Sequence, residues 1–150
     1  MKVAQHTKYN KNNIALNITE VSRPTMNENQ VLIKVSAAGV NPLDNMISRG
    51  EVEMIVPYKL PQIAGNEVVG IVESVGNQVN NLQVGDRVFG RLPLDHIGAF
   101  AEYVAVDSQA LAKVPDYLSD EEAAAVPLTA LTIMQALDLM GAQAGKTIFI

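Results

Sequence analysis

The sequence predicts a mainly β domain that is followed by two helices and by the beginning of a further strand. Through about the first 115 residues, apolar side chains recur with the period of two that is typical of strands, between turn-forming glycine, proline and asparagine. After Ser119 the apolar spacing changes to the helical period of 3.6. We therefore expect two domains, with residues 1–125 in the first and residues 126–150 at the beginning of the second.

The composition is that of a globular protein and excludes several classes of partner. Apolar residues make up 48% of the 150 positions, which is enough for a core. Nucleic acid is not an expected partner, because the net charge is −5 and a basic patch is needed to neutralise phosphates. There is no cysteine, no apolar run of membrane-spanning length and no secretory signal, so we expect no membrane association and a cytoplasmic location.

Two segments give the clearest strand patterns. Residues 31–39 alternate apolar and polar side chains, as a strand with one buried face does. Residues 67–75 are valine-rich on both faces, which predicts burial on both sides, and Gly70 within them indicates the close approach of another backbone. Weaker strand patterns cover residues 2–7, 14–21, 84–89, 98–106 and 111–114.

A short helix is predicted after the strand at 31–39. Asn41 can cap a helix, and Pro42 suits the first helical position because its missing N–H would have no partner there. The helix is expected to end near Gly50, and residues 51–61 are expected to form a loop.

The remaining helices follow the change of period. Ser119 and Glu122 have the spacing of a capping box and predict a helix that begins there. Residues 128–140 carry apolar side chains at helical spacing, and Gly141 is placed to end that helix. Residues 147–150 predict the start of a strand.

Five short segments follow one another in an order typical of one protein family: 38–44 (AGVNPLD), 61–70 (PQIAGNEVVG), 84–90 (VGDRVFG), 98–103 (GAFAEY) and 123–132 (AAAVPLTALT). Their order resembles the GroES-like N-terminal domain of the medium-chain dehydrogenase/reductase superfamily, in its zinc-independent quinone oxidoreductase branch. The resemblance implies a partly open β-barrel with short helices, followed by the first helices and strand of a truncated nucleotide-binding Rossmann domain. The glycine-rich turn that holds a dinucleotide pyrophosphate would follow residue 150.

The same resemblance implies an enzyme that transfers hydride from NADPH to a quinone or an α,β-unsaturated carbonyl compound. We expect the chain to be a piece of that enzyme, unable to bind NADPH by itself. The resemblance also implies a small-molecule substrate and a full-length protein that can form a homodimer. Two other readings stay open, namely a zinc-type alcohol dehydrogenase and a non-catalytic GroES-like binding module.

The amides at two positions favour an enzyme without zinc. Zinc-dependent members of the superfamily carry cysteine where this chain has Asn41 and histidine where it has Asn66. An amide is a poor zinc ligand, because zinc sites are built from thiolate, imidazole and carboxylate. The structural-zinc lobe of those members holds four cysteines in the interval that corresponds to residues 90–97, and this chain has none there. We expect His6 at the surface and His96 in a solvated loop, so no metal ligand is predicted.

The resemblance assigns the site residues. It places Asn41 and Asp44 at the inner end of the cleft as catalytic and cofactor-binding residues, and Leu128 and Thr129 beside the nicotinamide. Each polar residue also has a structural alternative: Asn41 can cap the helix, Asp44 can pair with Arg49, and the Thr129 hydroxyl can bond to its own helix.

Overall fold

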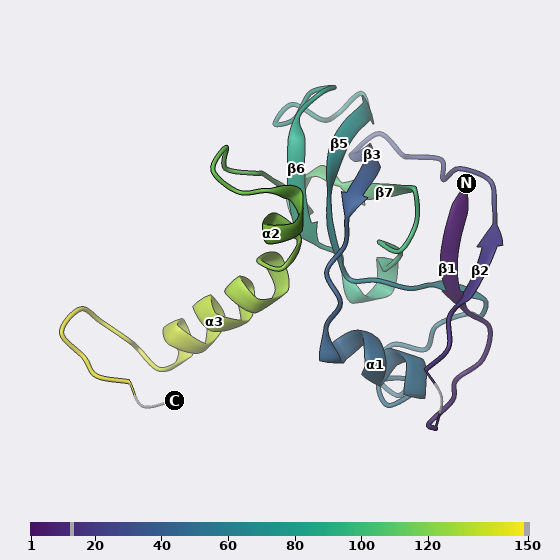
Figure 1. Cartoon of the computed structure of the whole chain (residues 1–150). Coiled ribbons are helices and arrows are strands. Elements are labelled where there is room, and N and C mark those ends of the chain that lie inside the picture. Colours follow the sequence, from purple (N-terminus) through teal and green to yellow (C-terminus); the bar gives the residue numbers. More distant parts are fainter. Residues whose placement is uncertain (13, 149–150) are drawn as a thin grey trace.

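A computed structural model describes residues 1–12 and 14–148, which form two antiparallel sheets and a helical arm (Figure 1). The larger sheet has the strand order β7-β3-β5-β6-β8 and the smaller one the order β2-β1-β4. Their bounds are β1 (Lys2–His6), β2 (Asn17–Glu20), β3 (Gln30–Ala37), β4 (Gln62–Ile63), β5 (Glu67–Val75), β6 (Arg87–Arg91), β7 (Tyr103–Asp107) and β8 (Ala112–Lys113). The mainly β prediction is confirmed, although the two sheets do not close into a barrel.

The core lies against the pair of strands β3 and β5. On the predicted face of β3, Val31 and Ile33 are fully buried and Val35 is partly buried, and they pack with Val68 and Val72 of β5. The other face of β5 is covered in its first half only, where Val69 packs beneath the helix at Asp120–Ala124. A Cβ on Gly70 would overlap the backbone carbonyl oxygen of Lys34, so the predicted close approach of a neighbouring strand is confirmed.

Two short helices begin where the sequence predicts, and the first also ends there, although the Asn41 side chain makes no capping hydrogen bond. Helix α1 (Pro42–Arg49) has proline at its first position and ends at Gly50, whose φ of 77° is left-handed. Helix α2 (Asp120–Ala124) follows a capping box, in which the Ser119 hydroxyl accepts from the Glu122 N–H at 3.1 Å and the Glu122 carboxylate accepts from the Ser119 N–H at 2.9 Å. Short 3₁₀ helices lie at η1 (Leu94–His96) and η2 (Ser108–Ala110).

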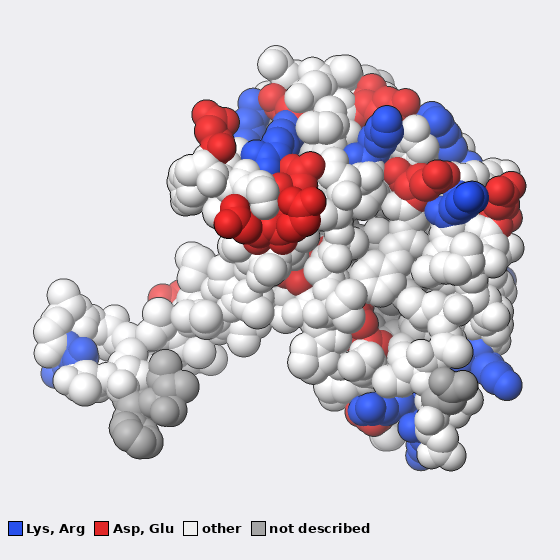
Figure 2. Space-filling model, in the orientation of Figure 1, with Lys and Arg blue, Asp and Glu red and all other residues white. Residues whose placement is uncertain are grey.

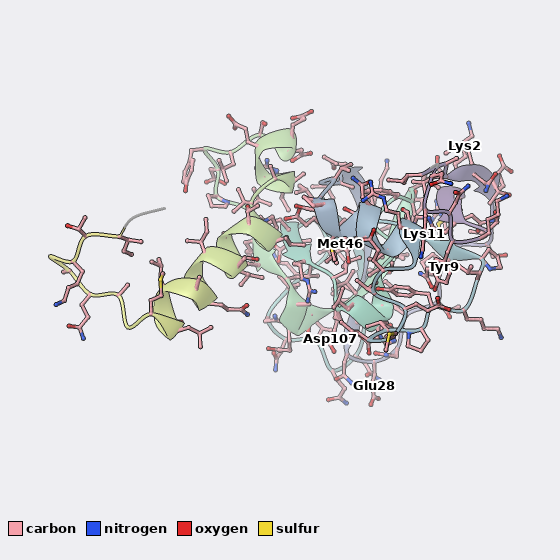
Figure 3. All side chains as sticks on the ribbon, turned by 90° about the horizontal axis from the view of Figure 1, so that it is seen from below. Lys2, Tyr9, Lys11, Glu28, Met46 and Asp107 are labelled. Carbon is pink, nitrogen blue, oxygen red and sulfur yellow. The ribbon has the colours of Figure 1, made fainter. Side chains whose placement is uncertain are left out.

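Helix α3 (Pro127–Leu139) extends away from both sheets, as Figures 1 and 3 show from perpendicular directions. Its first turn packs near β6, while apolar side chains further along are exposed, up to 90% for Leu139. Residues 147 and 148 form no strand, and the other two residues of the predicted last strand, 149 and 150, lie outside the described residues. Within the described part of the chain, no helix is long and apolar enough to cross a bilayer.

The largest departure from the predicted strands lies before β7. This strand begins at Tyr103 and not at Gly98, because the preceding segment bonds to the smaller sheet: Phe100 donates to the Ala64 carbonyl at 2.8 Å and accepts from the Ala4 N–H at 2.8 Å. The segment thereby connects the two sheets. Alternation alone could not separate it from β7, since both parts are extended.

Candidate functional site

The first turn of α1 brings Asn41 and Asp44 together. The backbone N–H of Asn41 donates to Oδ2 of Asp44 at 2.7 Å, and both residues are buried, with 8% and 6% of their surface exposed. The carboxylate therefore caps the start of the helix. Asp44 does not pair with Arg49. The ion pair of Arg49 is with Glu51, at 3.7 Å.

The start of β5 supplies the partners of these two side chains. The amide nitrogen of Asn66 donates to Oδ1 of Asp44 at 2.6 Å, and that of Asn41 donates to Oε2 of Glu67. The other carboxylate oxygen of Glu67 accepts from the backbone N–H of Leu128 in the first turn of α3, at 2.5 Å. We call Asn41, Asp44, Asn66 and Glu67 the amide–carboxylate network.

Both carboxylates of the network are buried without an ion pair to any residue that the structure describes. Asn66 and Glu67 are 0% and 1% exposed, and the donors that satisfy the two carboxylates are amide and peptide N–H groups. A buried carboxylate is tolerated when its oxygens are hydrogen-bonded in this way. A Cβ on Gly39 would overlap the Glu67 carboxylate, so the absence of a side chain there keeps the space open.

The donor set does not fit a catalytic zinc ion. An ionised carboxylate only accepts hydrogen bonds, so Asn41 and Asn66 must turn their NH₂ groups toward Glu67 and Asp44. An amide nitrogen that donates in this way has no lone pair to offer a metal. Over residues 1–12 and 14–148, no three histidine, cysteine or carboxylate side chains lie close enough together to hold an ion.

A cavity of about 220 Å³ lies between α1 and α3, beside the network. Figure 2 shows the surface hollowed between the arm that carries α3 and the part that carries α1. The residues that line the cavity are Leu43, Arg91, Leu128, Leu131, Thr132 and Gln135. Asn41 and Asp44 are not among these lining residues, but they lie at the same start of α1 as Leu43.

Only one of the two residues predicted beside the nicotinamide lines the cavity. Leu128 lines it, but Thr129 does not, and the Thr129 hydroxyl donates to the carbonyl groups of Ala125 and Val126 at 2.9 and 3.1 Å. Its structural alternative is therefore realised. Sequence reasoning missed Thr132, although its place four residues after Leu128 puts it on the same helix face.

His6 is the clearest error among the predicted positions. It was expected at the surface, but it is 3% exposed and its Nε2 atom has no hydrogen-bond partner within the described residues. Burial lowers the pKa of His6, and the nearby Asp44 carboxylate raises it by less. His96, in contrast, has 71% of its side chain exposed and pairs with Asp95, as expected of a loop residue.

Comparison with protein families and with single known proteins finds clear relatives of this chain. The sequence profile described as the alcohol dehydrogenase GroES-like domain matches residues 27–116. The 2-methylene-furan-3-one reductase of Solanum lycopersicum is 36% identical over 156 aligned residues, which cover 100% of this chain and 40% of that protein.

Two solved structures share this fold. The quinone oxidoreductase from Coxiella burnetii has a TM-score of 0.88 and 32% identity, over 97% of this chain and 46% of its own. The Escherichia coli quinone oxidoreductase complexed with NADPH has a TM-score of 0.80 and 28% identity, over 91% of this chain and 40% of its own. The chain thus spans less than half the length of each of these proteins.

Proposed function

Since this chain belongs to the alcohol dehydrogenase GroES-like domain family, we propose that it is the substrate-side domain of an NADPH-dependent reductase of quinones or α,β-unsaturated carbonyl compounds. The proposal extends to the whole protein, of which this chain would form the wall facing the substrate. The quinone oxidoreductases and the furanone reductase that the chain resembles support this substrate class.

The amide–carboxylate network is the observation that favours a reaction without a metal. It occupies the positions at which zinc-dependent relatives have their ligands, and its amides act as donors to buried carboxylates. Reduction of an aldehyde or a ketone to an alcohol usually relies on a Lewis acid or a proton relay at the oxygen. Hydride addition to a quinone or to the β-carbon of an enone spreads the charge over a conjugated system, so positioned donors can suffice.

The residues of the cavity would hold the reactants in place. When bound, NADPH supplies the hydride, whose electron pair enters the conjugated system, and a proton from water completes the reduction. Leu43 and Leu128 provide apolar walls that exclude water from the reacting faces. Asn41 and Asp44 fix the first turn of α1, on which Leu43 also lies, and we assign them a role in positioning the substrate and the nicotinamide ribose.

Thr132 lines the cavity together with Leu128 and is our preferred contact for the cofactor from α3, although its hydroxyl, like that of Thr129, donates to a carbonyl of its own helix, that of Leu128 at 2.7 Å. Thr129 as a cofactor-binding residue stays a prediction. Its hydroxyl would have to leave the carbonyl groups of Ala125 and Val126 in order to reach a ligand.

Isotope transfer tests the proposed reaction. The full-length protein is incubated with pent-3-en-2-one and NADPH that carries deuterium at C4 of the nicotinamide. We expect pentan-2-one with deuterium at C4, the former β-carbon. Pent-3-en-2-ol with deuterium on the carbinol carbon would show carbonyl reduction and favour an alcohol dehydrogenase, and no NADPH oxidation with this enone or with quinones would favour a non-catalytic module.

A further inference from the structure

Arg91 is the last residue of β6 and lies at the edge of the cavity. In a strand, every second side chain points to the same face, so Arg87, Phe89 and Arg91 share one face of the larger sheet. The first two have protein partners there. Arg87 donates to the Asp120 carboxylate and to the Leu118 carbonyl, both at 2.6 Å, and Phe89 packs with the apolar cluster beneath α2.

Arg91 differs from Arg87 in having no such partner. Its guanidinium makes no hydrogen bond or ion pair with any residue in the described part of the chain, although the side chain is partly buried and lines the cavity. Glu67 lies directly opposite it on β5. Both oxygens of that carboxylate, however, already accept hydrogen bonds from Asn41 and Leu128. The guanidinium donors of Arg91 are thus unused at the wall of the cavity, although the Glu67 carboxylate lies on the neighbouring strand.

The surroundings of Arg91 strengthen its interaction with a ligand. Three leucines make up half of the residues that line the cavity, and the Thr132 hydroxyl is engaged with the Leu128 carbonyl at 2.7 Å. The Arg91 side chain is partly buried, which reduces the access of water to it, so an anion there is held more strongly than on an open surface. The planar fork of N–H donors fits the paired oxygens of a carboxylate or a phosphate.

We propose that Arg91 binds an anionic group, a carboxylate or a phosphate, of the ligand held in this cavity. Resting on the proposed function, the inference defines the substrate class: the enzyme would prefer a quinone or an enone that carries a carboxylate near its conjugated system. If the phosphate belongs to the cofactor instead, the same residue contributes to cofactor affinity.

A matched pair of substrates separates charge from shape. The full-length protein is assayed with 4-oxopent-2-enoate and with its methyl ester, which share the enone and differ in the negative charge. In Arg91→Gln, the ratio of kcat/KM for the acid to that for the ester is expected to fall about tenfold, the loss of one charged hydrogen-bonded contact. Arg91→Lys, which keeps the charge without the fork, should lie between the two proteins.

The control removes one positive charge elsewhere. Lys34 is exposed on β3, away from the cavity lining, and Lys34→Gln should leave the ratio for the two substrates unchanged. A rise in KM for NADPH in Arg91→Gln, with the ratio for the two substrates unchanged, would assign the anion to the cofactor. If neither the ratio nor the KM for NADPH changes, Arg91 does not bind an anion and the inference is wrong.

Calorimetric titration keeps this test separate from the proposed function. Binding of 4-oxopent-2-enoate and of its ester to the full-length protein, with NADP⁺ present, requires no turnover. An inactive protein that binds the acid more tightly than the ester, and loses that preference in Arg91→Gln, would support the anion site while the proposed reaction fails. Equal binding of the acid and the ester by the unaltered protein, together with an unchanged KM or affinity for NADPH in Arg91→Gln, would overturn the inference itself.

Discussion

At the scale of single residues, the site depends on two buried carboxylates, Asp44 and Glu67, which amide and peptide donors stabilise and which pair with no cation among the described residues. Amino-acid substitutions in such an arrangement are poorly tolerated, because every hydrogen-bond donor faces a group that can only accept. The same property makes the pairings testable with substitutions that hardly change the size of a side chain.

Asn66→Asp is expected to destabilise the protein strongly. The substitution replaces the donor that lies 2.6 Å from Asp44 by a second carboxylate in a fully buried position. Loss of the hydrogen bond and repulsion of like charges should lower the free energy of unfolding by roughly 2–4 kcal/mol at neutral pH. Chemical denaturation measures this change.

Asn81→Asp is the matched control for that substitution. The Asn81 amide donates to the Ser108 carbonyl at 3.1 Å, but Asn81 is exposed, so the new carboxylate stays hydrated. We expect a loss of less than about 1 kcal/mol there. Equal losses for the two variants would mean that the contact between Asn66 and Asp44 has no special weight.

At the scale of secondary structure elements, Glu67 connects three parts of the fold. It lies on β5, accepts from Asn41 at the start of α1 and accepts from Leu128 in the first turn of α3. Apart from the contacts of its first part with β6, α3 extends away from the sheets, and most of its apolar side chains are exposed. The hydrogen bond to Leu128 is therefore a principal connection between the helix and the domain.

Glu67→Gln should loosen the start of α3. A glutamine offers one accepting oxygen where the structure has two N–H donors, so its NH₂ group must face one of them. We expect the amide hydrogen of Leu128 to exchange about tenfold faster, which corresponds to a loss of roughly 1.4 kcal/mol. Hydrogen exchange measured by NMR or mass spectrometry reports this directly.

Glu73→Gln provides the comparison for that experiment. Glu73 lies on the same strand in an exposed ion pair with Arg23, at 3.3 Å. Its substitution should leave the exchange of Leu128 unaffected, since exposed pairs contribute little. Unchanged exchange in Glu67→Gln as well would remove the proposed connection between β5 and α3.

Local sequence patterns predicted the two short helices whose starts or ends carry typical boundary residues. Asn41-Pro42 and Gly50 define α1, and the Ser119 capping box defines α2, because these signals act within a few residues. The two-residue strand β4 was missed, since it exists only through its pairing with β1. The segment before β7 was merged with that strand because its pairing with the smaller sheet is a long-range contact.

Local patterns revealed less of the site. The family resemblance pointed to Asn41 and Asp44, and their pairing with Glu67 and Asn66 joins positions more than twenty residues apart. No local sequence pattern identifies Arg91 or Thr132. Only the packing of α3 against β6 brings them to one cavity. His6 was placed wrongly because a polar side chain in a weak strand pattern gives no information about what covers it.

At the scale of the whole molecule, the buried His6 predicts how stability depends on pH. Its pKa is lowered from 6.5 by burial, so the unfolded chain binds a proton at a higher pH than the folded protein does. The free energy of unfolding should therefore decrease as the pH falls below about 6.5, until the folded pKa is passed, by at most about 1.4 kcal/mol per pH unit.

Comparison of two variants isolates this contribution. His6→Gln should show a weaker loss of stability between pH 7 and pH 5 than the unaltered protein, because glutamine does not titrate. His96→Gln, at an exposed position, should follow the unaltered protein. Parallel curves for His6→Gln and the unaltered protein would mean that His6 is hydrated in solution.

The central claim concerns the whole enzyme: that hydride transfer proceeds beside a network of amides and carboxylates, with no metal ion at the positions of Asn41 and Asn66. The most direct measurement is NADPH oxidation with a quinone by the full-length protein after dialysis against a strong zinc chelator, together with its zinc content. We predict full retained activity with far less than one zinc ion per chain. Stoichiometric zinc, with activity lost on chelation and restored by adding zinc back, would contradict this account.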